Sequence, residues 1–265
     1  MLSAFRELRG YGYLFRTFFR RDLSARYKAS VLGIVWSLLN PLMMMVIYTL
    51  VFAHVLRVAQ PDYSAWFITG FLPWFFFSTA LSMGAASLVG HASLITKVYF
   101  PRELLPLSMT AANLVNMFIA YAIFLPYAVY VRGISPAILL LIPISVAFYV
   151  FTAAIVMLLS AAMVYFRDVE FLIGIALTAW FYGVPVIYSF EPDANGHGGI
   201  GNLTIRHWLE RDPVVPFINA YRQVVFYKQT VSVSGMVLLY VMAIVAWIAC
   251  YAVFNRLKVR IAEEL

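Results

Sequence analysis

The stretch that decides the fold is RRDLSARYKASVLGIVWSLLNPLMMMVIYTLVFAHVL, residues 20–56. It opens with a cluster of basic residues, the last of them Lys28, and then continues to residue 56 without another Asp, Glu, Lys or Arg. Basic residues directly before a long apolar run are typical of a cytoplasmic anchor followed by a membrane span. The stretch therefore predicts a chain that functions in or across a lipid bilayer.

The composition extends this prediction to the whole chain. Of its 265 residues, 63% are hydrophobic and 12% are charged, and the mean hydropathy is +0.86. Soluble domains are about 45–50% apolar and about 25% charged. The formal charge of +7 is compatible with nucleic-acid binding, but the basic residues lie at the ends of the apolar runs. That distribution indicates a membrane topology, so we expect membrane lipids and no nucleic acid as partners.

Cysteine and histidine are too sparse for a disulfide framework or a metal site. Cys250 is the only cysteine, and His54, His91, His197 and His207 are scattered along the chain. Neither an internal disulfide nor a zinc cluster is therefore expected. The first apolar run is also too long, and begins too late, for a cleaved signal peptide.

Six apolar segments approach the roughly 20 residues that a bilayer requires. The N-terminus, the 90–104 loop, the turn at Arg167 and the C-terminus carry 13 of the 19 Lys and Arg, and the remaining loops carry 6. By the positive-inside rule, both termini are then cytoplasmic. We predict an all-α, multi-pass integral membrane protein, with bends at Pro41, Pro143 and Pro185. The predicted spans are 31–56, 66–89, 105–131, 136–165, 171–190 and 233–254.

Segment 1–28 alternates at helical spacing, with Phe15 and Phe18 on one face and Arg16 and Arg20 on the opposite one. The favoured interpretation is an amphipathic helix lying along an anionic cytoplasmic leaflet. A helix packed on a soluble partner is the alternative. We divide the chain into this helix, 1–28, and a single six-span domain, 29–265.

Segment 191–232 differs from a simple loop. Its Gly-rich run 195–199 predicts a flexible turn, and its apolar run 217–227 is too short to cross a bilayer. We expect short outer-face helices here. The run 217–227 either dips into the outer leaflet or caps the helix bundle.

Several classes of function are disfavoured by what the sequence lacks. It contains no GxxxxGK[ST] phosphate loop, so it does not bind ATP in the usual way. The spans carry almost no acid, base or histidine, which argues against an ion-driven carrier, an intramembrane enzyme and a voltage sensor. We therefore expect a chain that is not an enzyme.

Aromatic residues are abundant where charged ones are missing. There are 22 Phe, 17 Tyr and 6 Trp, and the clusters at 74–77 and 180–182 are denser than interfacial belts require. Aromatic faces can stack on sugar rings, so a path for a sugar polymer is one interpretation and ordinary packing is the other. The charged turn 167–170 also has two interpretations. One is a site that docks on a cytosolic protein, and the other is a local salt-bridged turn.

A series of short motifs follows one order along nearly the whole chain. They are Arg21-Asp22-Leu23, Arg26-Tyr27-Lys28, Ser30-Val31-Leu32-Gly33, Trp36, Leu39-Asn40-Pro41, Leu72-Pro73-Trp74-Phe75-Phe76, the segment 97–103 with Leu105-Pro106, Phe166-Arg167-Asp168, Pro185-Val186-Ile187-Tyr188, and Pro213 with Asn219-Ala220-Tyr221-Arg222. Together they resemble the permease subunit of polysaccharide and polyol-phosphate exporters of the ATP-binding-cassette class, second exporter type. Asp212-Pro213 stands where that family often has Asn-Pro, a departure that affects only a local turn.

The resemblance implies that two copies of the chain form a channel driven by two cytosolic ATP-binding-cassette subunits. Those subunits would bind ATP and magnesium, so no cofactor is expected in this chain. The substrate would be an undecaprenyl-linked polymer, either O-antigen or wall teichoic acid, exported across the cytoplasmic membrane of a bacterium. The short helices after the fifth span would lie near the outer exit.

The resemblance also gives candidate site residues. In the family, the N-terminal helix and the 91–103 loop meet the ATPase subunit, and here the first and fifth spans are expected to line the channel. The expected ATPase contacts are Arg20, Arg26, Lys97, Tyr99, Arg102 and Glu103. The candidate channel residues, chosen by their position in the two spans, are Trp36, Tyr48, Phe52, Trp180, Phe181 and Tyr188.

Two other functions stay open. A drug or small-lipid exporter of the same type is one, although such permeases usually carry a larger outer domain. An intramembrane enzyme acting on lipid-linked sugars is the other, and it would need converging acid, base or metal-binding residues.

Overall fold

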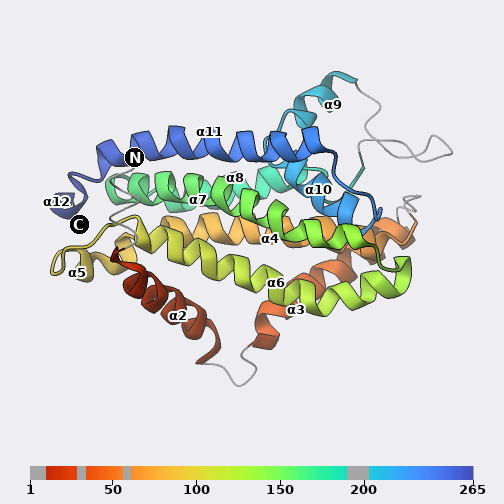
Figure 1. Ribbon diagram of the computed structural model, residues 1–265, viewed down its shortest axis with the longest axis horizontal. Helices are drawn as coiled ribbons and strands as arrows, with labels where there is room; N and C mark the ends of the chain where they lie inside the picture. The colour runs from red at the N-terminus through yellow and green to blue at the C-terminus, as the bar shows by residue number, and fades with distance from the viewer. Residues whose placement is uncertain (1–9, 29–33, 56–60, 190–202, 265) are drawn as a thin grey trace.

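A computed structural model describes residues 10–28, 34–55, 61–189 and 203–264, and every regular element in these ranges is a helix (Figure 1). The elements are α2 (Gly12–Lys28), α3 (Ile34–Tyr48), the π-helix η1 (Thr49–Val55), α4 (Tyr63–Ala85), η2 (Val89–His91), α5 (Ala92–Ile95), α6 (Leu104–Arg132), η3 (Pro136–Leu140), α7 (Leu141–Tyr165), α8 (Val169–Gly183), α9 (Leu203–Glu210), α10 (Val215–Val225), α11 (Val233–Leu257) and α12 (Ile261–Glu264).

Each predicted span contains a helix. Four of the helical segments, α4, α6, η3 with α7, and α11, are long and apolar enough to cross a membrane. The first and fifth spans hold shorter apolar helices, 39–55 and α8. The prediction that the fifth span continues as a helix toward residue 190 is wrong. Helix α8 ends at Gly183, because Val184 is extended, as expected for a residue before a proline.

Pro41 and Pro143 occupy different positions in their helices. Pro41 lies inside α3, as predicted. Pro143 is the third residue of α7, where its missing N–H costs nothing because the first turn of a helix has no intrahelical acceptors for these groups. The bend expected at Pro143 is replaced by a change from 3₁₀ to α geometry between η3 and α7.

Helix α4 is the centre of the bundle, in contact with α3, α6, α7, α8 and α10. In its most apolar 18-residue window, 72% of the residues are buried, compared with 22% for α11, which lies along α7 on the outside (Figure 1). A helix that is apolar all round lies either in a protein core or against lipid, and α4 occupies the core position. The aromatic cluster at 74–77 is therefore placed where the core is deepest.

Helix α10 packs against α4 and α7 rather than standing apart from the bundle. Phe217 and Tyr221, one turn apart, are fully buried, and the ring of Phe217 lies 4.8 Å from that of Phe148 on α7. Of the two interpretations of 217–227, the structure favours the one in which it packs on the bundle. Helix α9 projects outward instead, and its Trp208 is exposed (Figure 1).

Helix α2 is amphipathic but rests on the chain's own helices, alongside α6. Phe18 is buried, and its ring lies 5.6 Å from that of Phe100. One turn later the buried Asp22 is paired with Arg21 at 2.9 Å and accepts a hydrogen bond from Ser108 of α6. Part of the apolar face of α2 is thus buried against other segments of the same chain.

The loops that the charge count placed on one side of the membrane come together at one end of the bundle (Figure 1). We call this end, formed by α5, the 96–103 segment, the turn 166–168 and the 256–264 segment, the basic end. The other end, with the 133–135 turn, α9 and α10, is called the far end.

Candidate functional site

An open groove of about 430 Å³ lies between α3, α4 and α8. Its walls are formed mainly by aromatic rings and small polar side chains. They include Asn40, Tyr48, Phe71, Trp74, Ser78 and Phe181. None of its lining residues is an acid, lysine, arginine or histidine.

The aromatic wall comes from a repeat of four residues on α4. Tyr63, Phe67, Phe71 and Phe75 lie on one face, and successive rings stack with centroids 6.1, 5.1 and 5.8 Å apart. Residues four apart are neighbours on a helix, so the spacing alone produces the column. The 74–77 cluster alone does not identify the α4 side of the groove, whereas this four-residue period, which is readable from the sequence, does.

Three hydroxyl groups of the groove, those of Ser78, Thr79 and Thr178, are bound to carbonyls of their own helices. Thr79 donates to the carbonyl of Phe75 at 2.6 Å, and Thr178 donates to that of Gly174 at 2.9 Å. Such bonds satisfy the hydroxyl hydrogens inside an apolar segment and leave oxygen lone pairs toward the groove. The surface is therefore suited to uncharged, hydroxyl-bearing molecules.

Two of the six candidate channel residues line this groove, and three others lie elsewhere. Tyr48 and Phe181 line it, with ring centroids 5.7 Å apart. Phe52 does not line the groove and stacks on Tyr63. Trp36 lies on α3, and its side chain is outside the described part of the chain.

Trp180 and Tyr188 have structural partners instead. The indole N–H of Trp180 donates to a carboxylate oxygen of Asp212, whose other oxygen accepts from the Val214 N–H at 2.7 Å. Burial raises the pKa of the Asp212 carboxyl, and the hydrogen bonds that it accepts oppose this shift. The Tyr188 hydroxyl donates to the carbonyls of Tyr182 and Gly183 at the end of α8.

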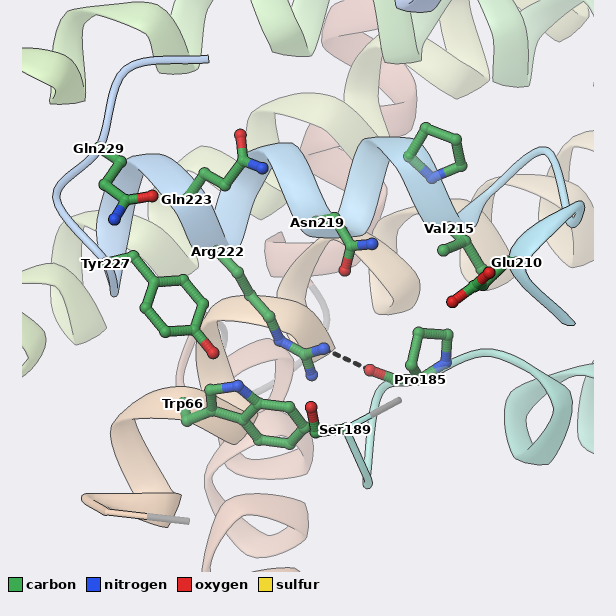
Figure 2. Close-up of a pocket in the computed structure, with 11 residues that line it drawn as sticks. Trp66, Pro185, Ser189, Glu210, Val215, Asn219, Arg222, Gln223, Tyr227 and Gln229 are labelled. Atoms are coloured by element: carbon green, nitrogen blue, oxygen red, sulfur yellow. Dashed lines mark hydrogen bonds between the residues drawn. The ribbon is translucent and has the colours of Figure 1, made fainter. Parts of the chain in front are cut away.

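The far end contains a pocket of about 620 Å³ between α10, α9, the start of α4 and the 185–189 turn (Figure 2). Arg222 is 3% exposed, and its guanidinium carbon lies 3.6 Å from the ring centroid of Trp66. Its two terminal nitrogens donate to the carbonyls of Pro185 and Val186, in the turn that follows α8. One buried cation thus joins α10, α4 and the turn after α8.

Gly70 makes this arrangement possible. A Cβ atom at position 70 would lie 2.5 Å from a terminal nitrogen of Arg222. Burial lowers the pKa of Arg222 to about 9, so the group still carries its charge at neutral pH. Arg222 belongs to the motif Asn219-Ala220-Tyr221-Arg222, which by itself predicted no role for this side chain.

At the basic end, two of the expected ATPase contacts are engaged within the chain. The guanidinium of Arg102 donates to the backbone carbonyl of Lys258, and the ammonium of Lys258 lies 2.8 Å from a carboxylate oxygen of the buried Glu103. We call this set of three residues the clasp. It holds the 96–103 segment against the end of α11.

The other expected contacts are arranged differently. Arg20 and Lys97 are exposed, and Tyr99 is 85% exposed. Arg26 lies on α2, and its side chain is outside the described residues. Tyr99 is thus a large aromatic side chain presented to solvent, three residues before the clasp.

Comparison with known proteins agrees with this architecture. The model of the ABC-2 type transporter family matches residues 13–192. The O-antigen export system permease protein RfbA of Myxococcus xanthus is 29% identical over 267 residues, which cover 100% of both chains. RfbA of Klebsiella pneumoniae is 30% identical over 260 residues, 96% of each chain. The chain therefore belongs to the ABC-2 type transporter family, as a multi-pass membrane subunit of an ABC transporter.

Proposed function

We propose that this chain is the permease of an ATP-driven exporter of lipid-linked polysaccharide, of the O-antigen kind. The observation that carries the proposal is similarity along the full length to two O-antigen export permeases. The groove agrees with it, because aromatic rings and neutral polar groups suit a hydroxyl-rich polymer. The polymer would pass outward across the cytoplasmic membrane of a bacterium.

The proposed assembly has two copies of this chain and two ATP-binding subunits. The basic end faces the cytoplasm in this assembly, with both termini, in line with the positive-inside rule. ATP and magnesium are held by the partner subunits, and this chain holds no cofactor. The aromatic groove of α3, α4 and α8 faces the second copy, so that two grooves enclose the path.

Within this assembly, we assign the expected partner contacts two different roles. The exposed Arg20, Lys97 and Tyr99 meet the ATP-binding subunit directly. Arg102 and Glu103 act through the clasp, transmitting displacement of the 96–103 segment to α11. Coupling then means that ATP-driven closure of the partner subunits biases the bundle between two states.

The experiment is to delete the gene and to reconstitute the purified protein with its ATP-binding partner. We expect the deletion strain to accumulate lipid-linked polymer inside the cell, and the reconstituted complex to hydrolyse ATP. Normal surface polymer in the deletion strain would contradict the proposal. Drug sensitivity with intact surface polymer would instead identify a drug or small-lipid exporter.

A further inference from the structure

The far-end pocket has walls of opposite charge. Figure 2 shows Arg222 and Asn219 projecting from α10 toward Pro185, with the carboxylate of Glu210 approaching from the side of α9. Asn219 and Arg222 are three residues apart and so lie on the same side of α10. The pocket therefore presents a cationic donor, an amide and an anionic acceptor around one space.

The donor side of the pocket is held rigidly. The guanidinium of Arg222 is fixed by two backbone carbonyls and by the ring of Trp66. It carries five N–H groups, and its Nε finds no acceptor among the described residues. Groups that are already fixed lose little freedom on binding, so the Arg222 side of the pocket is organised before a ligand arrives.

The two charges restrict the class of ligand. An anion would be attracted to Arg222 but repelled by Glu210, and a cation would experience the opposite. A neutral ring bearing hydroxyl groups satisfies both sides, because each hydroxyl donates one hydrogen bond and accepts others. The volume of about 620 Å³ lies within the range of about 300–1,000 Å³ that is usual for small-molecule pockets.

We propose that the far-end pocket is a binding site for a neutral sugar unit, with Asn219 and Glu210 as its hydrogen-bonding side chains and Arg222 as its fixed floor. The inference rests on the proposed function, under which the far end is the exit side of the exporter. The pocket would hold a ring of the departing glycan next to α10.

The test uses the purified full-length permease, without its ATP-binding partner, in phosphatidylcholine nanodiscs. Saturation-transfer NMR measures binding of the methyl glycosides of glucose, mannose, galactose and N-acetylglucosamine. We expect saturable binding of at least one of them. Asn219→Leu should weaken it about fivefold, the effect of losing one hydrogen bond, and Glu210→Gln should weaken it by a similar factor because a charged acceptor is replaced by a neutral one.

Asn255→Leu is the matched control, because it makes the same chemical change at an exposed position of α11 at the basic end. Its binding should equal that of the unmodified protein. Arg211→Gln controls for net charge, since Arg211 is exposed next to Glu210 but does not line the pocket. Melting temperatures show that each variant is folded, and Glu210→Gln, which keeps side-chain volume, remains informative if Asn219→Leu does not fold.

Three outcomes would overturn the inference. The first is the absence of saturable binding for all four glycosides, and the second is binding that Asn219→Leu and Glu210→Gln leave unchanged. The third is displacement of the glycoside by inorganic phosphate at equal concentration, which would make the pocket an anion site. If the unmodified protein exports polymer but binds none of the glycosides, this inference alone fails, whereas absence of export defeats the proposed function.

Discussion

The far end and the basic end of the bundle both bury an ionisable side chain, but they neutralise it in different ways. At the far end, the buried Arg222 is held by two backbone carbonyls and an aromatic ring. At the basic end, Glu103 is held by the flexible side chain of Lys258, which is 31% exposed. The comparison indicates that the contacts of Arg222 hold the far end rigid, whereas the Glu103–Lys258 pair at the basic end can break and form again.

The exposed surface shows the same contrast. The basic end presents Tyr99 to solvent at 85% exposure, near the exposed Lys97. Large exposed aromatic residues with nearby charges are typical of surfaces that bind a protein partner. The far end instead has a pocket of small-molecule size. One end is thus suited to a protein and the other to a small ligand.

The largest effect is expected at Gly70, as a test of rigidity at the far end. Gly70→Ala places a Cβ 2.5 Å from Arg222, so the guanidinium must move and lose both carbonyls. Leaving a buried charge without partners costs about 3–5 kcal/mol. We expect a large fall in the melting temperature of the detergent-solubilised protein. Gly90→Ala, where no atom lies within 4 Å of the new Cβ, should be close to neutral. Equal melting temperatures for the two variants would contradict the rigid far end.

The clasp is expected to give the second largest effect. Lys258→Met removes the partner of the buried Glu103, which costs about 3–5 kcal/mol for a fully buried pair and less here, since Lys258 is partly exposed. The reconstituted complex should hydrolyse ATP with less polymer exported per ATP. The charge swap Glu103→Lys with Lys258→Glu should recover part of the loss. Lys97→Met is the control for stability. An equal fall in its melting temperature would show that the Lys258–Glu103 pair stabilises the protein no more than an exposed lysine does.

A smaller effect is expected at Asp212, which joins the far end to α8. Its two carboxylate oxygens accept from Trp180 and Val214, whereas asparagine has one such oxygen and would turn an NH₂ group toward a donor. Asp212→Asn should lower the free energy of unfolding by about 1–3 kcal/mol. Asp168→Asn, at a helix start where no side-chain cap bond forms, should cost less than about 1 kcal/mol. An unchanged melting curve for Asp212→Asn would remove the structural reason for aspartate at this position.

The smallest effect on stability is expected at Tyr99. Because its side chain is exposed, Tyr99→Ala should change the free energy of unfolding by no more than about 0.5 kcal/mol. Binding of the ATP-binding partner, measured by pull-down or by ATPase stimulation, should nevertheless weaken. Tyr130→Ala is the matched control, since Tyr130 is 90% exposed near the far end of α6. If both variants bind the partner normally, Tyr99 is not part of the contact.

The comparison between the ends also shows where sequence reasoning succeeds. The apolar runs predicted helices at all six places, because a segment in lipid must satisfy its backbone internally. Charge counts grouped the loops correctly, since the 96–103, 166–168 and 256–264 segments meet at the basic end. Val184, the residue before Pro185, is extended. Residues before proline disfavour helical geometry, so the position of Pro185 in the sequence already indicates that the helix of the fifth span ends there.

The long-range partners of the candidate residues were not predicted. Arg102 and Glu103 were expected to contact the ATPase subunit from the resemblance of the 91–103 loop, and the structure adds a partner, Lys258, that is 155 residues away in sequence from Glu103. Trp180 was chosen as a channel residue by its position in the fifth span, and the structure adds the bond from its indole N–H to Asp212. Neither partner can be found from local spacing.

The sequence by itself determined the membrane setting, the helical class, the grouping of loops by charge and the aromatic period on α4. These follow from local rules, since hydropathy, helix spacing and the effect of proline act over a few residues. Only the tertiary structure decided that Arg222 is buried above Trp66, that Glu103 pairs with Lys258, and that α10 packs into the bundle. Each of these depends on side chains that are far apart in the chain and meet only when the helices pack, because burial and pairing are properties of the packed bundle.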